Sequence, residues 1–152
     1  MTIVDRALMQ ANGGERLEIL LRSYAALSGE ALALDIHQLW QSNRIVVAHD
    51  TKDPPRFFYA NLAALKLFGI TARKMIGMAS YKTARPDARD ERAAMLARLE
   101  NEDIVTGYGG VRIAGDGSRF RIIDAVIWNL RDEAGQRIGQ AATWTDWQPL
   151  EG

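Results

Sequence analysis

The sequence has no cysteine and only two histidines among its 152 residues. Without cysteine, disulfides, thiolate zinc sites, iron–sulfur clusters, cysteine nucleophiles and covalent cysteinyl-flavin adducts are all excluded. The histidines, His37 and His49, are isolated from each other, and no other cluster of ligating residues accompanies them. We therefore expect no metal site.

An excess of charge of one sign is also missing. Nineteen basic and nineteen acidic side chains cancel, so no net field attracts nucleic acid or an anionic membrane. No window approaches the roughly 20 apolar residues that a membrane span requires. The polar N-terminal stretch lacks the continuous apolar centre of a signal peptide. We expect a cytoplasmic protein that binds neither nucleic acid nor membrane.

The composition, 47% apolar and 25% charged, is typical of one folded soluble domain. Apolar residues recur at the three-and-four spacing of a helix from Leu17 to Leu27, and a second helical stretch runs from Leu32 to Trp40. The expected divisions are an N-terminal helical extension at residues 1–43, a main domain at 44–148 and a tail at 149–152.

The main domain begins with two short strands, IVVAH and Phe57 to Tyr59, joined by a turn-rich segment. Asn61 is placed to cap a helix over 62–68, which Gly69 ends, and TARKMIG predicts a short helical turn. A longer helix is expected to begin at Pro86, with Asp87 in its first turn.

Three strand-like runs follow, at 104–114, 119–130 and 137–147. The turn residues between them are those of antiparallel hairpins. Two strands, a group of helices and a three-stranded meander do not form parallel units. The order therefore predicts an α+β fold with a five-stranded antiparallel sheet.

Particular residues carry a family resemblance. YANLAALKLFG followed by TARKMIG resembles the helical segment of PAS domains. HDTKDPPRFFYANLAALKLFG, YGGVRI, GSRFRI, AVIWNL and GQAATW together resemble the MEKHLA family, a PAS-like domain found alone in bacteria and at the end of certain plant transcription factors. The literal hexapeptide that gave the family its name is absent, which favours the bacterial stand-alone type.

The resemblance implies a PAS-like five-stranded antiparallel sheet with helices on one face, preceded by N-terminal helices. It also implies a sensory or interaction module, and it transfers no catalytic residue and no ligand. Haem-binding PAS domains commonly use a histidine on the long helix, and the segment 86–101 has none. The cofactor is therefore left unknown. The chain ends shortly after Asp146, so we expect a separate signalling protein to receive the signal.

The run from Phe120 to Asn129 is apolar on both alternating faces after Ile122. A sheet with one face in water does not show this pattern. The second face must be covered by the N-terminal helices or by another subunit. The pattern predicts a homodimer.

Asp124 interrupts one of these apolar faces, and a buried carboxylate needs a partner such as Arg112, Arg121 or backbone donors. One interpretation is an internal ion pair. The other is a small cavity in which an acid, a base and aromatic walls select a polar, partly aromatic ligand. The candidate ligand-binding residues are Tyr59, Tyr108, Arg112, Asp124, Trp128 and Trp144. The glycine-rich YGGV lacks the lysine of a phosphate loop and indicates a bulged or closely approached strand.

The preferred hypothesis is a stand-alone PAS-like sensory, ligand-binding or protein-interaction module without catalytic residues. Two alternatives stay open. One is a dimerisation domain with a filled core and no ligand. The other is a small acid–base enzyme that uses a cavity behind the sheet, with Asp124 as the base and Tyr59 or Tyr108 as the proton donor.

Overall fold

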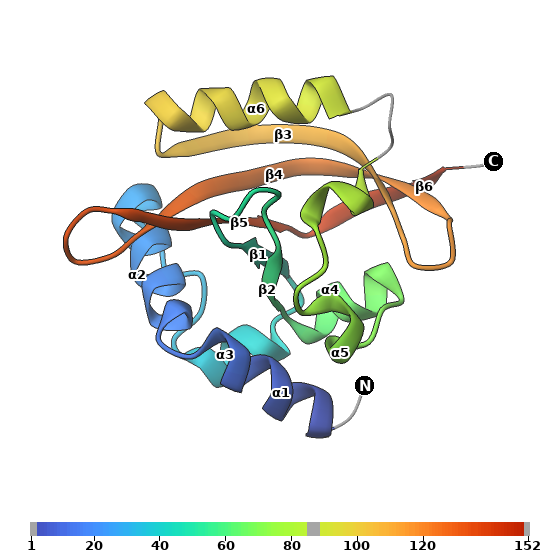
Figure 1. Cartoon of the computed structure of the whole chain (residues 1–152), viewed down its shortest axis with the longest axis horizontal. Helices are drawn as coiled ribbons and strands as arrows, with labels where there is room; N and C mark the ends of the chain where they lie inside the picture. The colour runs from blue at the N-terminus through green and yellow to red at the C-terminus, as the bar shows by residue number, and fades with distance from the viewer. Residues whose placement is uncertain (1–2, 85–88, 151–152) are drawn as a thin grey trace.

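The structure, a computed structural model, describes residues 3–84 and 89–150 (Figure 1). The expected helix start at Pro86 and Asp87 lies outside these residues. The described part of the chain contains seven helical segments: α1 (Ile3–Gly13), α2 (Arg16–Ser28), α3 (Ile36–Gln41), α4 (Leu62–Phe68), α5 (Ala72–Met75), the 3-10 turn η1 (Ser80–Thr83) and α6 (Arg89–Asn101). The strands there are β1 (Ile45–His49), β2 (Phe57–Ala60), β3 (Ile104–Ile113), β4 (Arg119–Arg131), β5 (Arg137–Trp144) and β6 (Asp146–Leu150).

The described strands form one antiparallel sheet, as predicted, and five of them follow the order β2-β1-β5-β4-β3. The long β4 pairs with β3 along one edge and with β5, then β6, along the other. The expected last strand at 137–147 is interrupted at Thr145, which makes two strands of it. The sheet thus has six strands rather than five, and β6 includes residues 149 and 150 of the expected tail.

The pairing of β3 with β4 contains two irregularities that offset each other. One extra residue lies in β3 between Val105 and Tyr108, and one lies in β4 between Ile122 and Ala125. The β4 bulge places Asp124 at φ 54°, which is unusual for a residue other than glycine. Because of this bulge, Ile122 and Ala125 point to the same face although they are three residues apart.

The outer face of the sheet, defined here as the face toward α2, is covered by N-terminal helices. The ring of Trp128 meets that of Tyr24 edge-on at 4.8 Å between centroids. Its indole N–H donates to the carbonyl of Leu20 at 3.4 Å. Beside β2, the side chain of Asn12 donates to the carbonyl of Phe58 at 2.7 Å. The helices of the chain itself therefore provide the cover that the strand pattern requires.

The inner face, opposite to α2, carries α4, η1 and α6 (Figure 1). Buried Asn61 fixes the position of α4: its side-chain oxygen accepts from the backbone N–H groups of Ala64 and Val46, and its amide donates to the carbonyls of Leu39 and Arg44. Both ends of α4 follow the sequence prediction, with Gly69 in the left-handed conformation at its C-terminus.

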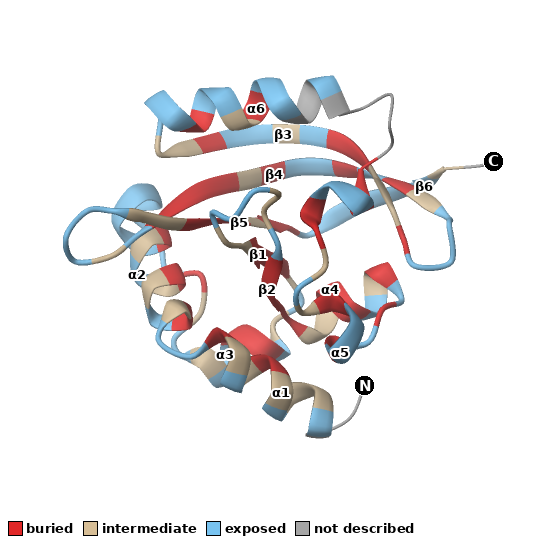
Figure 2. Ribbon diagram, in the orientation of Figure 1, coloured by how far each residue is buried: buried red, intermediate tan, exposed pale blue. Residues whose placement is uncertain are grey.

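A smaller apolar cluster fixes α6 against the inner face of β3 and β4. It consists of Met95, Leu99, Val105 and Ile127. Figure 2 shows that the remaining surface of α6 is mostly exposed. The helix is therefore attached by a narrow apolar stripe, in which Met95 and Leu99 are buried and Leu96 is half-buried.

Candidate functional site

A cavity of about 50 Å³ lies between the inner face of the sheet and the helical segments α4, η1 and α6. Its apolar wall includes Val47, Phe57, Phe68, Met95, Leu96, Ile122, Ala125, Ile127 and Ala142. Its polar lining includes His49, Ser80, Thr83, Tyr108, Arg112, Gln140 and the indole of Trp144. An apolar cavity with a few polar groups is the usual form of a small-molecule site.

Tyr108 and Arg112 meet at the β3 side of this cavity. An Nη2–H group of Arg112 donates to the Tyr108 hydroxyl at 3.0 Å, and an Nη1–H group donates to the carbonyl of Val111 at 3.2 Å. The guanidinium carbon lies 5.5 Å from the centre of the Tyr108 ring. Gly110, between them on the same face, makes this contact sterically feasible: a Cβ at Gly110 would lie 2.5 Å from the tyrosine oxygen.

Trp144 lies at the β5 side of the cavity, edge-on to Phe68 with 6.5 Å between ring centroids. The side chain is only 3% exposed. Its indole nitrogen has no hydrogen-bond partner among the residues that the structure describes. A buried N–H group without an acceptor lowers the stability of the folded protein. A guest with an acceptor atom beside this indole would therefore bind more favourably.

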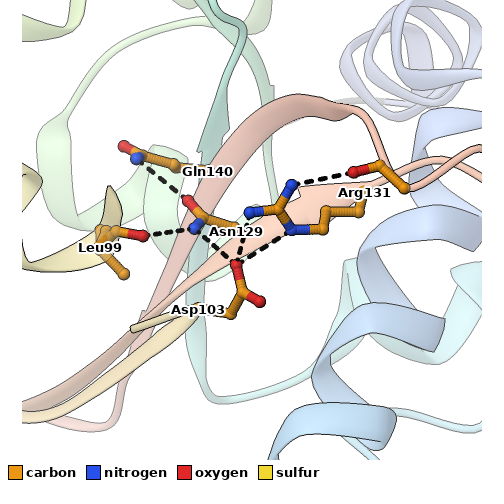
Figure 3. A network of polar contacts seen from close by, with 6 residues as sticks. Leu99, Asp103, Asn129, Arg131 and Gln140 are labelled. Carbon is orange, nitrogen blue, oxygen red and sulfur yellow. Dashed lines mark hydrogen bonds and ion pairs between the residues drawn. The ribbon is translucent and has the colours of Figure 1, made fainter. Parts of the chain in front are cut away.

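Gln140 connects the cavity to a polar network that extends from the buried Asn129 to the surface (Figure 3). Its amide donates to the side-chain oxygen of Asn129 at 3.1 Å, and the Asn129 amide donates to the carbonyl of Leu99 at 2.7 Å and to Asp103 at 3.0 Å. Arg131 completes the network with an ion pair to Asp103 at 2.9 Å. The end of α6 is thereby tied to β4 and β5.

The carboxylate of Asp103 is held in its charged form by this network. The hydrogen bond from Asn129 is the largest cause that lowers its pKa, followed by the hydrogen bond from Arg131. Both side chains of the Asp103–Arg131 pair are about 40% exposed, so water screens their attraction. The network therefore positions α6 through hydrogen bonds more than through charge.

Three of the six candidate site residues line the cavity, namely Tyr108, Arg112 and Trp144. The other three do not. Tyr59 pairs with Ala48, which alternates with the cavity residues Val47 and His49, so its side chain faces away from the cavity. Trp128 packs against α2 on the outer face.

Asp124 is the third residue that the structure places elsewhere. It is exposed, at the β4 bulge. The expectation of a buried ion pair assumed uninterrupted alternation along β4. The bulge adds a residue there, so Ile122 and Trp128 face opposite sides of the sheet and Asp124 interrupts neither apolar face.

Gln140 and Asn129 were missed by the sequence analysis. Polar side chains inside strands carry no distinctive periodic signal. These two residues are directly opposite each other across the β4–β5 hairpin, but the register shifts between Leu130 and Arg131, so the turn at 132–135 alone does not predict that pairing. Because of this shift, the sequence alone does not predict the cross-strand pair of amides.

The described residues contain no cluster of three or more histidine, cysteine, aspartate or glutamate side chains that could hold a metal ion. None of the helices within residues 3–84 and 89–150 is both long enough and apolar enough to cross a bilayer.

Known structures with the same arrangement of sheet and helices are PAS and light-oxygen-voltage domains. The PAS domain of a protein from Colwellia psychrerythraea is 16% identical with a TM-score of 0.63, over 76% of this chain and 92% of that one. A light-oxygen-voltage domain studied with a flavin analogue is 17% identical with a TM-score of 0.60, over 76% and 84%. An RNA-binding light-oxygen-voltage receptor is 21% identical with a TM-score of 0.62, over 73% of this chain and 31% of the receptor. The fold is therefore a PAS fold.

The family to which the chain belongs follows from a match to its amino-acid sequence. The model of the MEKHLA domain matches residues 15–149, almost the whole chain. The chain belongs to the MEKHLA domain family. A search of curated proteins finds no significant match.

Proposed function

We propose that the protein is a PAS-like sensory module that responds to a small molecule bound in the cavity. The cavity between the inner face and α6 carries this proposal, because its wall is apolar and a few buried polar groups converge on it. Gln140 lines the cavity. Its amide donates to Asn129, which in turn donates to the carbonyl of Leu99 in α6. A guest that displaces Gln140 would therefore also displace Asn129 and, through its hydrogen bond to Leu99, the end of α6.

The cavity does not fit a flavin. Its volume of about 50 Å³ is well below the roughly 300 Å³ at which pockets for drug-sized ligands begin. The chain also lacks the cysteine that a covalent flavin adduct requires. We therefore derive no photochemistry for this protein, and the proposed guest is much smaller than a flavin.

An acid–base enzyme is less well supported by the geometry. The base assigned to that alternative, Asp124, is exposed at the β4 bulge, and Tyr59 faces away from the cavity. Only Tyr108 of that set lines the cavity. We propose a module without catalysis that acts in the cytoplasm on a separate signalling protein.

We also propose that homodimers form through the part of the outer face on β4 and β6. Arg121, Ile123, Asp146 and Gln148 are exposed there, with 42% of Ile123 accessible. Opposite charges on one patch suit a two-fold contact, in which each charge meets its complement on the second copy. Sedimentation velocity tests this: wild type should dimerise and Ile123→Asp should not, whereas a wild-type monomer at all concentrations would exclude it.

The cavity proposal is tested by filling the cavity. Ala142 lines the cavity, so we expect the larger side chain of Ala142→Leu to fill part of it and exclude a guest. Ala93→Leu makes the same change at an exposed position on α6 and is the matched control. In a thermal-shift screen of small solutes, at least one solute should stabilise wild type and Ala93→Leu but not Ala142→Leu. If no solute stabilises wild type, or if all three proteins respond equally, the proposal fails.

A further inference from the structure

The cavity presents hydrogen-bond donors to its guest. Arginine and tryptophan side chains have donors and no acceptor, and both Arg112 and Trp144 line the cavity. The hydroxyl of Tyr108 accepts from Arg112, which leaves its own proton available to donate. Three side chains therefore offer donors to a guest, and acceptor atoms are what such a guest must supply.

The charge of the lining has the same implication. Among the described residues that line the cavity there is no aspartate or glutamate, whereas Arg112 is present. The exposed position of Asp124 removes the acid that the sequence placed beside Arg112. Of the five N–H groups of the guanidinium, two have acceptors in the described part of the chain, the Val111 carbonyl and the Tyr108 hydroxyl.

The strand is built to hold this donor pair in place. Tyr108, Gly110 and Arg112 lie on one face of β3, opposite Ala125, Ile122 and Phe120 of β4. A side chain at Gly110 would collide with the tyrosine oxygen at 2.5 Å and crowd Arg112 Nη1 at 3.3 Å. The YGGVR segment, whose glycines fit no phosphate loop, thus has a role: glycine leaves room for the two side chains to meet.

We propose that the guest is a short monocarboxylate, held by Arg112 and Tyr108 through its carboxylate and by the apolar wall through its alkyl end. The proposal rests on the cavity function above and names its ligand class. The volume limits the guest to a few heavy atoms, because about 50 Å³ is only a third of the roughly 150 Å³ apolar cavity that takes up benzene. Charge-assisted hydrogen bonds in a partly dry site provide the selection for an anion.

The test uses propionate and its neutral counterpart propionamide at equal ionic strength. Each is titrated into ¹⁵N-labelled protein while the backbone amides of Tyr108 and Arg112 and the indole N–H of Trp144 are followed, since these three residues line the cavity. We expect propionate to shift these signals and saturate, with an affinity at least about tenfold higher than that of propionamide, as expected for loss of a charged hydrogen-bond partner.

Two variants assign the effect to the donor pair. Arg112→Gln should lower propionate affinity about tenfold or more and leave propionamide binding unchanged. Arg73→Gln removes the same charge from α5, where the side chain is exposed and does not line the cavity, and should have no effect. Tyr108→Phe keeps the ring and should weaken propionate several-fold, which provides the answer if Arg112→Gln does not fold.

The outcomes separate the two proposals. Equal binding of propionate and propionamide, or equal effects of Arg112→Gln and Arg73→Gln, would overturn the carboxylate assignment and leave the cavity function standing. Absence of site-specific shifts with both solutes would overturn the assignment too. The cavity proposal would fail with it only if the solute screen with Ala142→Leu were also negative.

Discussion

Trp128→Ala tests how the outer face of the sheet is held. The ring is fully buried, meets Tyr24 edge-on at 4.8 Å and donates to the Leu20 carbonyl. Truncation of a buried tryptophan typically costs about 3–5 kcal/mol, from lost transfer energy and the cavity left behind. We expect about 4 kcal/mol, because the aromatic contact adds to the loss while the indole hydrogen bond is long and contributes little.

The assay is urea unfolding. With a slope of about 2 kcal/mol per molar, a loss of about 4 kcal/mol moves the midpoint down by about 2 M. Trp147→Ala is the control: the same truncation at a side chain that is 40% exposed removes less buried apolar area and should cost about 2 kcal/mol, half as much. Equal effects of the two substitutions would refute the packing of α2 on β4 as the source of stability.

Three further predictions concern single positions. Gly139→Ala should destabilise by more than about 2 kcal/mol in urea unfolding, because a Cβ there would lie 2.4 Å from the carbonyl oxygen of His49; a neutral result would contradict the close approach of β5 to β1. Tyr59→Phe should be neutral or stabilising in the same assay, since the buried hydroxyl has no partner among the described residues and burial raises its pKa; clear destabilisation would reveal a partner. The third prediction concerns pH. The pKa of Asp103 is lowered, so its stabilisation is present above the unfolded pKa of about 3.9 and is lost as pH falls through the lower folded value. The difference in unfolding free energy between wild type and Asp103→Asn should therefore shrink below about pH 4, and a pH-independent difference would contradict the network.

Local signals allowed the sequence to predict α4 with its correct bounds. Asn61 caps the first turn and Gly69 takes the left-handed conformation at the end, and both effects act within a few residues. The strands of the meander were predicted for the same reason, because their turns are short and their residues favour strands.

The β4 bulge could not be predicted in this way. Asp124, at φ 54°, lies in the β4 bulge that offsets the extra residue of β3 between Val105 and Tyr108, and a pairing between two strands is not visible in either strand alone. The cavity residues depend on that pairing, so Asp124 and Trp128 were assigned to a site that they do not reach. Tyr108 and Arg112, which the sequence analysis placed at a cavity, both line it, because the extra residue at this point lies in β4 and not in β3.

A crystal structure determined under xenon pressure tests the central claim most directly, because xenon enters small apolar cavities that are accessible in the folded state. We predict a xenon atom beside Phe68, Ile122 and Ile127, in the cavity between the inner face and the helices. If that volume is filled by ordered side chains and no xenon enters, the protein has no guest site behind its sheet.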